Sequence, residues 1–137
     1  MKLTNTLTMK RKAGMTLLEL TVVILVLLSL ISILFIGARA WKKGSDRAAN
    51  ILNIRNVQQA VRAHANVRGL NIGDALVATT DILGSGKYLN SPTPPNTDIS
   101  YAFLATVPTI GQLYTTATYA SGTSTDYAPS TTLTAEW

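Results

Sequence analysis

The sequence contains no cysteine, a single histidine and no proline before Pro92. Without cysteine there is no disulfide, no thiol nucleophile and no thiolate ligand for zinc. One histidine excludes a cluster of histidine metal ligands, and no nucleophile motif accompanies His64 for a Ser-His-Asp triad. We therefore expect no enzyme activity, no cofactor and no metal centre, and we expect His64 to be solvated or interfacial.

Two patterns carry ligand-binding residue types without the required spacing. Gly84-Ser85-Gly86-Lys87 resembles part of a phosphate-binding loop, but Asp81 replaces its first glycine and Tyr88 its magnesium-binding hydroxyl, so we predict a turn. Aspartates in the C-terminal part offer oxygen ligands for calcium, but their spacing matches no calcium loop: Asp74, Asp81, Asp98 and Asp126.

Charged residues are scarce, at 14% of the sequence, and they are unevenly distributed. The net charge is +5, but four cations lie in residues 1–14, and the chain without them would carry +1. Residues 39–68 are basic, whereas residues 69–137 carry more acids than bases. This balance is not that of a nucleic-acid-binding protein, so we expect no nucleic-acid partner.

An uncharged run of nineteen residues extends from Leu20 to Ala38 and consists mostly of leucine, isoleucine and valine. As a helix, residues 15–37 would be about 34 Å long at about 1.5 Å per residue, enough to cross a hydrocarbon layer of about 30 Å. A secretory signal peptide cleaved after Ala38-Arg39-Ala40 is the alternative. However, the run exceeds the usual length of about 7–15 residues, and arginine is unfavourable in the cleavage triplet. We predict a transmembrane segment.

Glu19 is the only ionisable residue between Met15 and Ala38. Its charge would cost about 2.5–3.5 kcal/mol at the centre of a bilayer and less near a helix end. Thr16-x-x-Glu19 fits a capping box, in which each side chain bonds the other residue's backbone N–H. This local role is one explanation for the glutamate, and the residues around it suggest a second.

A fixed order of residues precedes the apolar run: the basic Lys10-Arg11-Lys12, the small Gly14, the apolar Met15 and then Glu19. This order resembles the N-terminal motif of type IV pilins and of the pseudopilins of type II secretion. The resemblance implies that a prepilin peptidase recognises the basic leader and cleaves between Gly14 and Met15, and that Met15 is then methylated. It also implies that Glu19, the fifth residue of the mature chain, pairs with the N-terminal ammonium of a neighbouring subunit and sets the filament register.

The same resemblance implies a structural protein with defined partners. These are other copies of the chain in a helical filament, the prepilin peptidase, and an assembly platform protein with its ATPase. The chain would first span the bacterial inner membrane once with its N-terminus in the cytoplasm, and then enter a periplasmic or cell-surface filament. The alternative is an uncleaved, single-pass membrane-anchored module that binds an extracytoplasmic partner.

Residues 39–68 change from uniformly apolar to amphipathic. Apolar residues recur there at spacings of three or four, as on one face of a helix: Ala48, Ile51, Ile54, Val57, Val61 and Ala65. Since no proline interrupts, we predict one helix over residues 16–67, ended by Gly69 in a left-handed cap. The basic residues that open this half also suit a lipid-headgroup anchor: Arg39, Lys42 and Lys43.

The remaining 69 residues, 69–137, contain turn-rich and strand-like segments. We predict a short helix over 73–83, a proline-rich connector over 91–97, strands over 99–107 and 112–120, and a weaker third strand over 127–135. A part of this size does not form a sufficient core alone, so it should dock on the apolar stripe of the helix.

The predicted fold is therefore α+β, with a long N-terminal helix and a small antiparallel sheet packed on its distal half. The predicted organisation is a leader over 1–14, a transmembrane half-helix over 15–38, an amphipathic half-helix over 39–68, and a globular part over 69–137.

Overall fold

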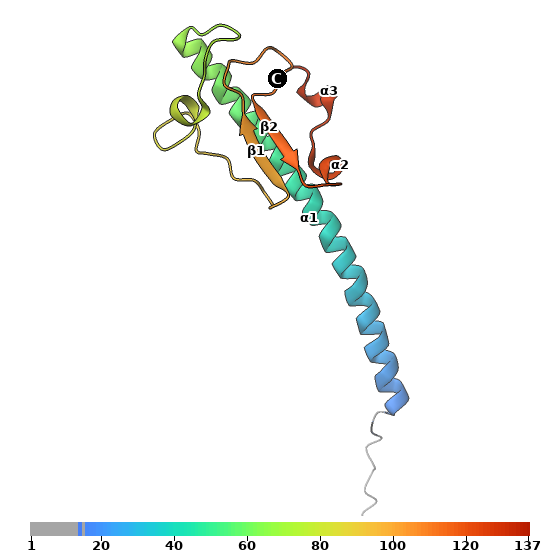
Figure 1. Cartoon of the computed structure of the whole chain (residues 1–137). Coiled ribbons are helices and arrows are strands. Elements are labelled where there is room, and N and C mark those ends of the chain that lie inside the picture. The colour runs from blue at the N-terminus through green and yellow to red at the C-terminus, as the bar shows by residue number, and fades with distance from the viewer. Residues whose placement is uncertain (1–13, 15) are drawn as a thin grey trace, which may run out of the picture. The chain divides into compact units, whose positions relative to one another are not determined.

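The computed structural model describes Gly14 and residues 16–137, so Met15 and the leader residues Lys10, Arg11 and Lys12 lie outside the described residues. The chain divides into two compact units, residues 1–38 and 39–137. Helix α1 extends over Leu17–Arg68 and contributes to both units (Figure 1). The helix predicted over residues 16–67 is confirmed, with each end displaced by one residue.

In the first unit, the uncharged polar side chains of α1 are all hydroxyls. Each of these hydroxyls donates a hydrogen bond to a carbonyl of the same helix. Thr21 Oγ1 donates to the carbonyl of Leu18 at 2.8 Å. Ser29 and Ser32 donate in the same way to carbonyls one turn earlier, at 2.7 and 2.8 Å. Such bonds are how serine and threonine satisfy their hydroxyls within helices. The segment thus presents no unpaired hydroxyl donor to apolar surroundings.

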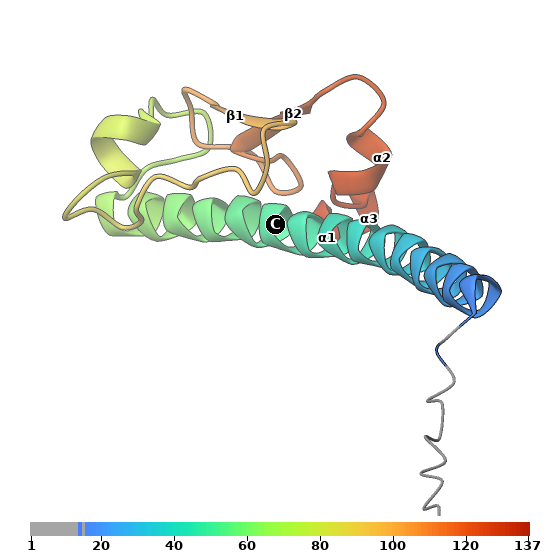
Figure 2. The same cartoon turned by 90° about the horizontal axis from the view of Figure 1, so that it is seen from below.

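In the second unit, one face of α1 residues 39–68 carries the core. Buried side chains of the helix meet buried side chains from later segments: Val57, Val61 and Ala65 pack with Leu76, Ile82 and Tyr114. Strands β1 and β2 lie alongside this half of the helix (Figure 2). The predicted α+β fold, a long N-terminal helix with a small antiparallel sheet packed on its distal half, is confirmed.

Helix α1 ends at a glycine cap, as predicted. Gly69 has φ of +66°, in the left-handed region that glycine adopts without a steric penalty. The N–H of Leu70 donates to the carbonyl of Ala65 at 2.9 Å, which satisfies one of the free carbonyls of the last turn.

The helix predicted over residues 73–83 is wrong for most of its length. Only the five-residue π-helix η1, Ala78–Ile82, is helical. Before it, the chain is extended and pairs with the segment after β1: Ala75 bridges Thr106, and the N–H of Leu76 donates to Ala105 at 2.9 Å. The backbone groups that a helix would use are taken by this distant partner, so tertiary pairing overrides the local helix preference.

The sheet formed by the described residues has two antiparallel strands, β1 Ile99–Phe103 and β2 Thr115–Tyr119. Ile99 lies opposite Tyr119, and Phe103 opposite Thr115. Burial alternates along both strands, so one face is turned inward and the other is exposed. Both predicted strands are confirmed in type and pairing, although each is shorter than predicted.

The third strand predicted over residues 127–135 is wrong. Two short helices occupy this region, α2 Ser124–Tyr127 and α3 Thr131–Thr134. Pro129 lies between them and lacks the N–H that a strand ladder needs. Thr123 Oγ1 donates to the carbonyl of Ala120 at 2.8 Å, a local bond of the kind by which hydroxyl residues favour turns over strands.

Candidate functional site

The start of α1 holds the residues that the sequence marks for processing and assembly. Gly14, Thr16 and Glu19 are all exposed. The backbone N–H of Thr16 donates to Glu19 Oε2 at 2.9 Å, and the N–H of Glu19 donates to Thr16 Oγ1 at 3.3 Å. The predicted capping box is therefore formed.

The capping box determines what the Glu19 carboxylate can still do. Only Oε2 takes part in a hydrogen bond within the described residues, so Oε1 keeps its accepting capacity. The carboxylate also lies in the first turn of α1, where the helix dipole favours negative charge. Among the described residues, the Glu19 carboxylate thus lies at the helix start with one oxygen left for a further donor.

No other part of the described chain covers the first half of α1. Its large apolar side chains between Leu17 and Ile36 are exposed, from 45% for Val23 to 80% for Leu17. Within the described residues, this helix is the one long and apolar enough to cross a membrane, and none of its most apolar stretch is buried. Apolar surface of this extent on all sides of a helix requires a lipid or protein cover.

The distal half of α1 docks through polar side chains as well as apolar ones. Asn50 is fully buried and uses its whole amide. Its Nδ2 donates to the carbonyl of Tyr127 at 3.0 Å and to the Tyr119 hydroxyl at 3.1 Å, and its Oδ1 accepts from the Tyr101 hydroxyl at 2.8 Å. One helix residue thereby fixes both strands and α2.

Gln58, which is 2% exposed, makes a second set of polar contacts between α1 and the end of the sheet. Its Nε2 donates to the carbonyl of Gln112 at 3.1 Å, and its Oε1 accepts from the N–H of Tyr114 at 2.9 Å. The side-chain amide takes the place that a neighbouring strand's peptide group would take. It satisfies backbone groups that no third strand reaches.

The apolar periodicity of the sequence does not predict this polar face. The buried positions at the start of the docking face are Asp46 and Asn50, whereas Ala48 is exposed and Ile51 only half-buried. Asp46 and Asn50 lie eight and four residues before Ile54, so all three share one face of the helix. Because Asp46 and Asn50 are polar, a pattern of apolar residues alone does not reveal that this face continues to them.

Two ion pairs occur among the described residues, and one of them joins α1 to α2. Lys43 Nζ lies 2.8 Å from Asp126 Oδ2, and this hydrogen bond and charge attraction raise the pKa of the lysine. Lys42 lies 3.5 Å from Asp46 one turn along the helix. Both lysines remain largely exposed, so solvent screens these pairs and they contribute little to stability.

The other candidate ligands stay apart in the described part of the chain. No group of three or more histidine, aspartate or glutamate side chains comes together there as a metal site. Asp74, Asp81 and Asp126 each bond a different partner: the N–H of Asn71, the N–H of Val77 and Lys43. Lys87 bonds carbonyls of η1, so Gly84-Ser85-Gly86-Lys87 is a turn closed by its own lysine.

His64 is buried at the interface of α1 with the following segment, 6% exposed. Its ring meets that of Tyr88 edge to face, with centroids 5.3 Å apart. Of the two predicted environments, solvated or interfacial, the second is therefore the one observed.

None of the family models, curated proteins or solved structures compared with this chain matches it. Its function is therefore argued from its own residues.

Proposed function

We propose that this chain is the structural subunit of a type IV filament, either a pilus or a type II secretion pseudopilus. The observation that carries the proposal is the bare apolar half of α1, whose large side chains are exposed from residue 17 to residue 36. Lipid covers such a surface in the membrane, and identical helices can cover it when they bundle. A filament core made from many copies of this segment would bury leucine, isoleucine and valine against one another.

Processing follows from the residues before the helix. We propose that a prepilin peptidase recognises Lys10, Arg11 and Lys12, cleaves between Gly14 and Met15, and methylates Met15. Gly14 is exposed and lies before Leu17, the first residue of α1. A platform protein and its ATPase would then extract the mature chain from the inner membrane into the filament.

Glu19 would set the axial register of neighbouring subunits. In an apolar bundle an unpaired carboxylate is costly, and the new N-terminal ammonium of an adjacent copy is a suitable partner. The capping box leaves Oε1 available for that partner while Oε2 stays bonded to Thr16. A wrong axial step would leave both charges unpaired, so the correct step is favoured.

Two substitutions at Glu19 separate its proposed assembly role from its capping role. Glu19→Gln keeps an amide that can serve in a capping box but removes the charge, whereas Glu19→Ala removes both. If the charge sets the register, both variants should be depleted at least tenfold from sheared filaments, with unchanged amounts in the membrane. Normal assembly of Glu19→Gln would contradict the register role and leave capping as the function of Glu19.

An uncleaved membrane-anchored binding module is the second candidate. The capping box favours it, because the box accounts for Glu19 within one chain and without a neighbouring subunit. Such a module would keep residues 1–14 and would not be recovered in filaments.

A further inference from the structure

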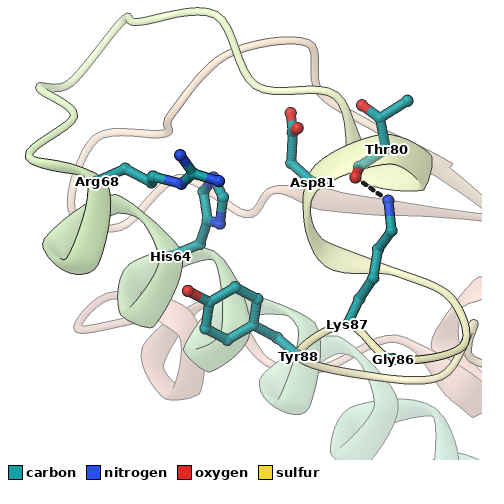
Figure 3. Close-up of a pocket in the computed structure, with 7 residues that line it drawn as sticks. All are labelled: His64, Arg68, Thr80, Asp81, Gly86, Lys87 and Tyr88. Atoms are coloured by element: carbon teal, nitrogen blue, oxygen red, sulfur yellow. Dashed lines mark hydrogen bonds between the residues drawn. The ribbon is translucent and has the colours of Figure 1, made fainter.

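The second unit contains a polar cavity of about 440 Å³ beside the end of α1. Its walls come from three segments: His64 and Arg68 from α1, Thr80 and Asp81 from η1, and Gly86, Lys87 and Tyr88 from the following turn. Figure 3 shows Arg68 and His64 on one side, Asp81, Thr80 and Lys87 across from them with the Lys87 side chain reaching to Thr80, and Tyr88 along the lower side. The volume falls within the range of about 300–1,000 Å³ that is typical of small-molecule sites.

The two cationic side chains of this cavity, Arg68 and Lys87, differ in the partners that they already have. Arg68 belongs to neither of the two ion pairs found among the described residues, so its planar guanidinium has no carboxylate partner there. Lys87 is held in place, because its Nζ donates to the carbonyls of Thr79, at 3.3 Å, and Thr80. An ammonium has three N–H donors, so one remains for a ligand.

Three further groups extend the binding chemistry beyond the two cations. Asp81 accepts the N–H of Val77 through Oδ2 at 2.8 Å, which fixes the carboxylate and leaves Oδ1 as an acceptor for a hydroxyl. The buried Nδ1 of His64 has no hydrogen-bond partner among the described residues, whereas buried polar atoms nearly always have one. Tyr88 offers both a ring face and a phenolic hydroxyl.

We propose that this cavity binds a small hydroxylated carboxylate of the acidic-sugar class. Arg68 would take the ligand carboxylate with two parallel N–H bonds, and Lys87 would add a third donor. Asp81 would accept a sugar hydroxyl and exclude ligands that present only negative charge. The inference does not depend on filament assembly, because every residue of the cavity belongs to residues 64–88.

The test is a titration of the full-length chain in detergent micelles, followed by nuclear magnetic resonance shifts of residues 64–88. The probes are D-galacturonate, D-galactose, which lacks the carboxylate, and acetate, which lacks the hydroxyls. We expect saturable shifts with D-galacturonate, weaker binding of acetate and none of D-galactose. Absence of saturable shifts with D-galacturonate, or equal binding of D-galactose, would overturn the proposal.

Two arginine variants locate the binding to the cavity. Arg68→Gln should weaken D-galacturonate binding about tenfold or more, the loss expected for about 1.4 kcal/mol of interaction. Arg47→Gln changes an exposed arginine of the same helix that does not line the cavity, so it should bind as the parent does. Equal weakening by both variants would mean that net charge alone attracts the ligand. Arg68→Lys should restore part of the affinity, because it returns the charge without the planar fork.

Discussion

Asn50 shows how a single polar residue can determine where a helix docks. Its amide meets two tyrosine hydroxyls and one backbone carbonyl, and all three partners come from segments at least 51 residues away in sequence. Hydrogen bonds have directional requirements that apolar contacts lack. Asn50 therefore fixes the rotation of α1 against the sheet, while Ile54, Val57 and Val61 supply the buried apolar surface.

Replacing Asn50 should lower the free energy of unfolding, because its partners would each lose a hydrogen bond. Asn50→Ala removes the acceptor of the Tyr101 hydroxyl and leaves the Tyr127 carbonyl without its donor, and we expect a loss of about 2–3 kcal/mol in the free energy of unfolding. The measurement is denaturant unfolding of the full chain in detergent, followed by near-ultraviolet circular dichroism. Asn66→Ala, at an exposed position of the same helix, should stay within about 0.5 kcal/mol of the parent. Equal losses in the two variants would refute the special role of Asn50.

Two tyrosines should make the second unit sensitive to alkali. Burial raises the pKa of Tyr114 above its ordinary value of 10.0, and the charge of Asp81 adds to the rise. Burial likewise raises the pKa of Tyr101, partly offset by a hydrogen bond from Asn53. The unfolded chain releases these two protons at a lower pH than the folded chain does. The contribution of the two tyrosines to the free energy of unfolding is therefore fully present below about pH 10, and it is lost as the pH rises through their pKa values in the folded chain.

Unfolding free energies measured between about pH 9 and pH 11.5 test this dependence. The parent should lose stability across the interval, and Tyr114→Phe should show a smaller slope because it has no proton to release. An unchanged slope in Tyr114→Phe would contradict the burial argument.

Whether the sequence could predict the burial of a given residue depended on the chemistry of its side chain. The apolar stripe located Ile54, Val57, Val61 and Ala65 correctly, because burial of such residues depends only on their being apolar. Asn50 is buried with tyrosine hydroxyls as partners, Gln58 with peptide groups at the end of a strand, and His64 with an aromatic ring. Those partners become neighbours only once the chain has folded.

Among the secondary-structure elements, α1 and the two strands were predictable, and the short helices were not. A long helix without proline, ended by glycine, is determined by local signals. The segment 73–76 instead pairs with residues 105–107, and residues 124–134 form single helical turns beside Pro129. Both outcomes depend on contacts or turns that hydrophobic periodicity does not encode.

Two glycines of α1 and its cap should respond oppositely to the same substitution. Gly69 has φ of +66°, so Gly69→Ala forces a left-handed alanine and should cost about 1–2 kcal/mol. Gly44 lies within the helix with no atom near an added methyl group, so Gly44→Ala should stabilise by about 0.5–1 kcal/mol. Since an added methyl group would also meet no neighbour at Gly69, sterics with other residues do not explain a loss there.

Thermal unfolding of the two alanine variants in the same detergent measures both signs at once. Destabilisation by Gly44→Ala as large as that of Gly69→Ala would show that α1 does not continue as a regular helix through residue 44.

At the scale of the whole molecule, the two halves of α1 meet different needs. Residues 39–68 bury one face against their own chain, and the free energy of that contact holds the second unit together. Residues 17–38 make no such contact with the rest of the described chain and expose apolar side chains on all sides. A surface of this kind is stable only in lipid or against other apolar helices, and the proposed subunit would encounter both in succession.

The most direct test of the proposed function is mass spectrometry of the N-terminal peptide from protein isolated out of its own membranes. The proposal predicts a chain that begins at Met15, carries a methyl group on its terminal amine and lacks residues 1–14. A chain that keeps residues 1–14, in cells with an active prepilin peptidase, would contradict it and leave an uncleaved membrane-anchored domain.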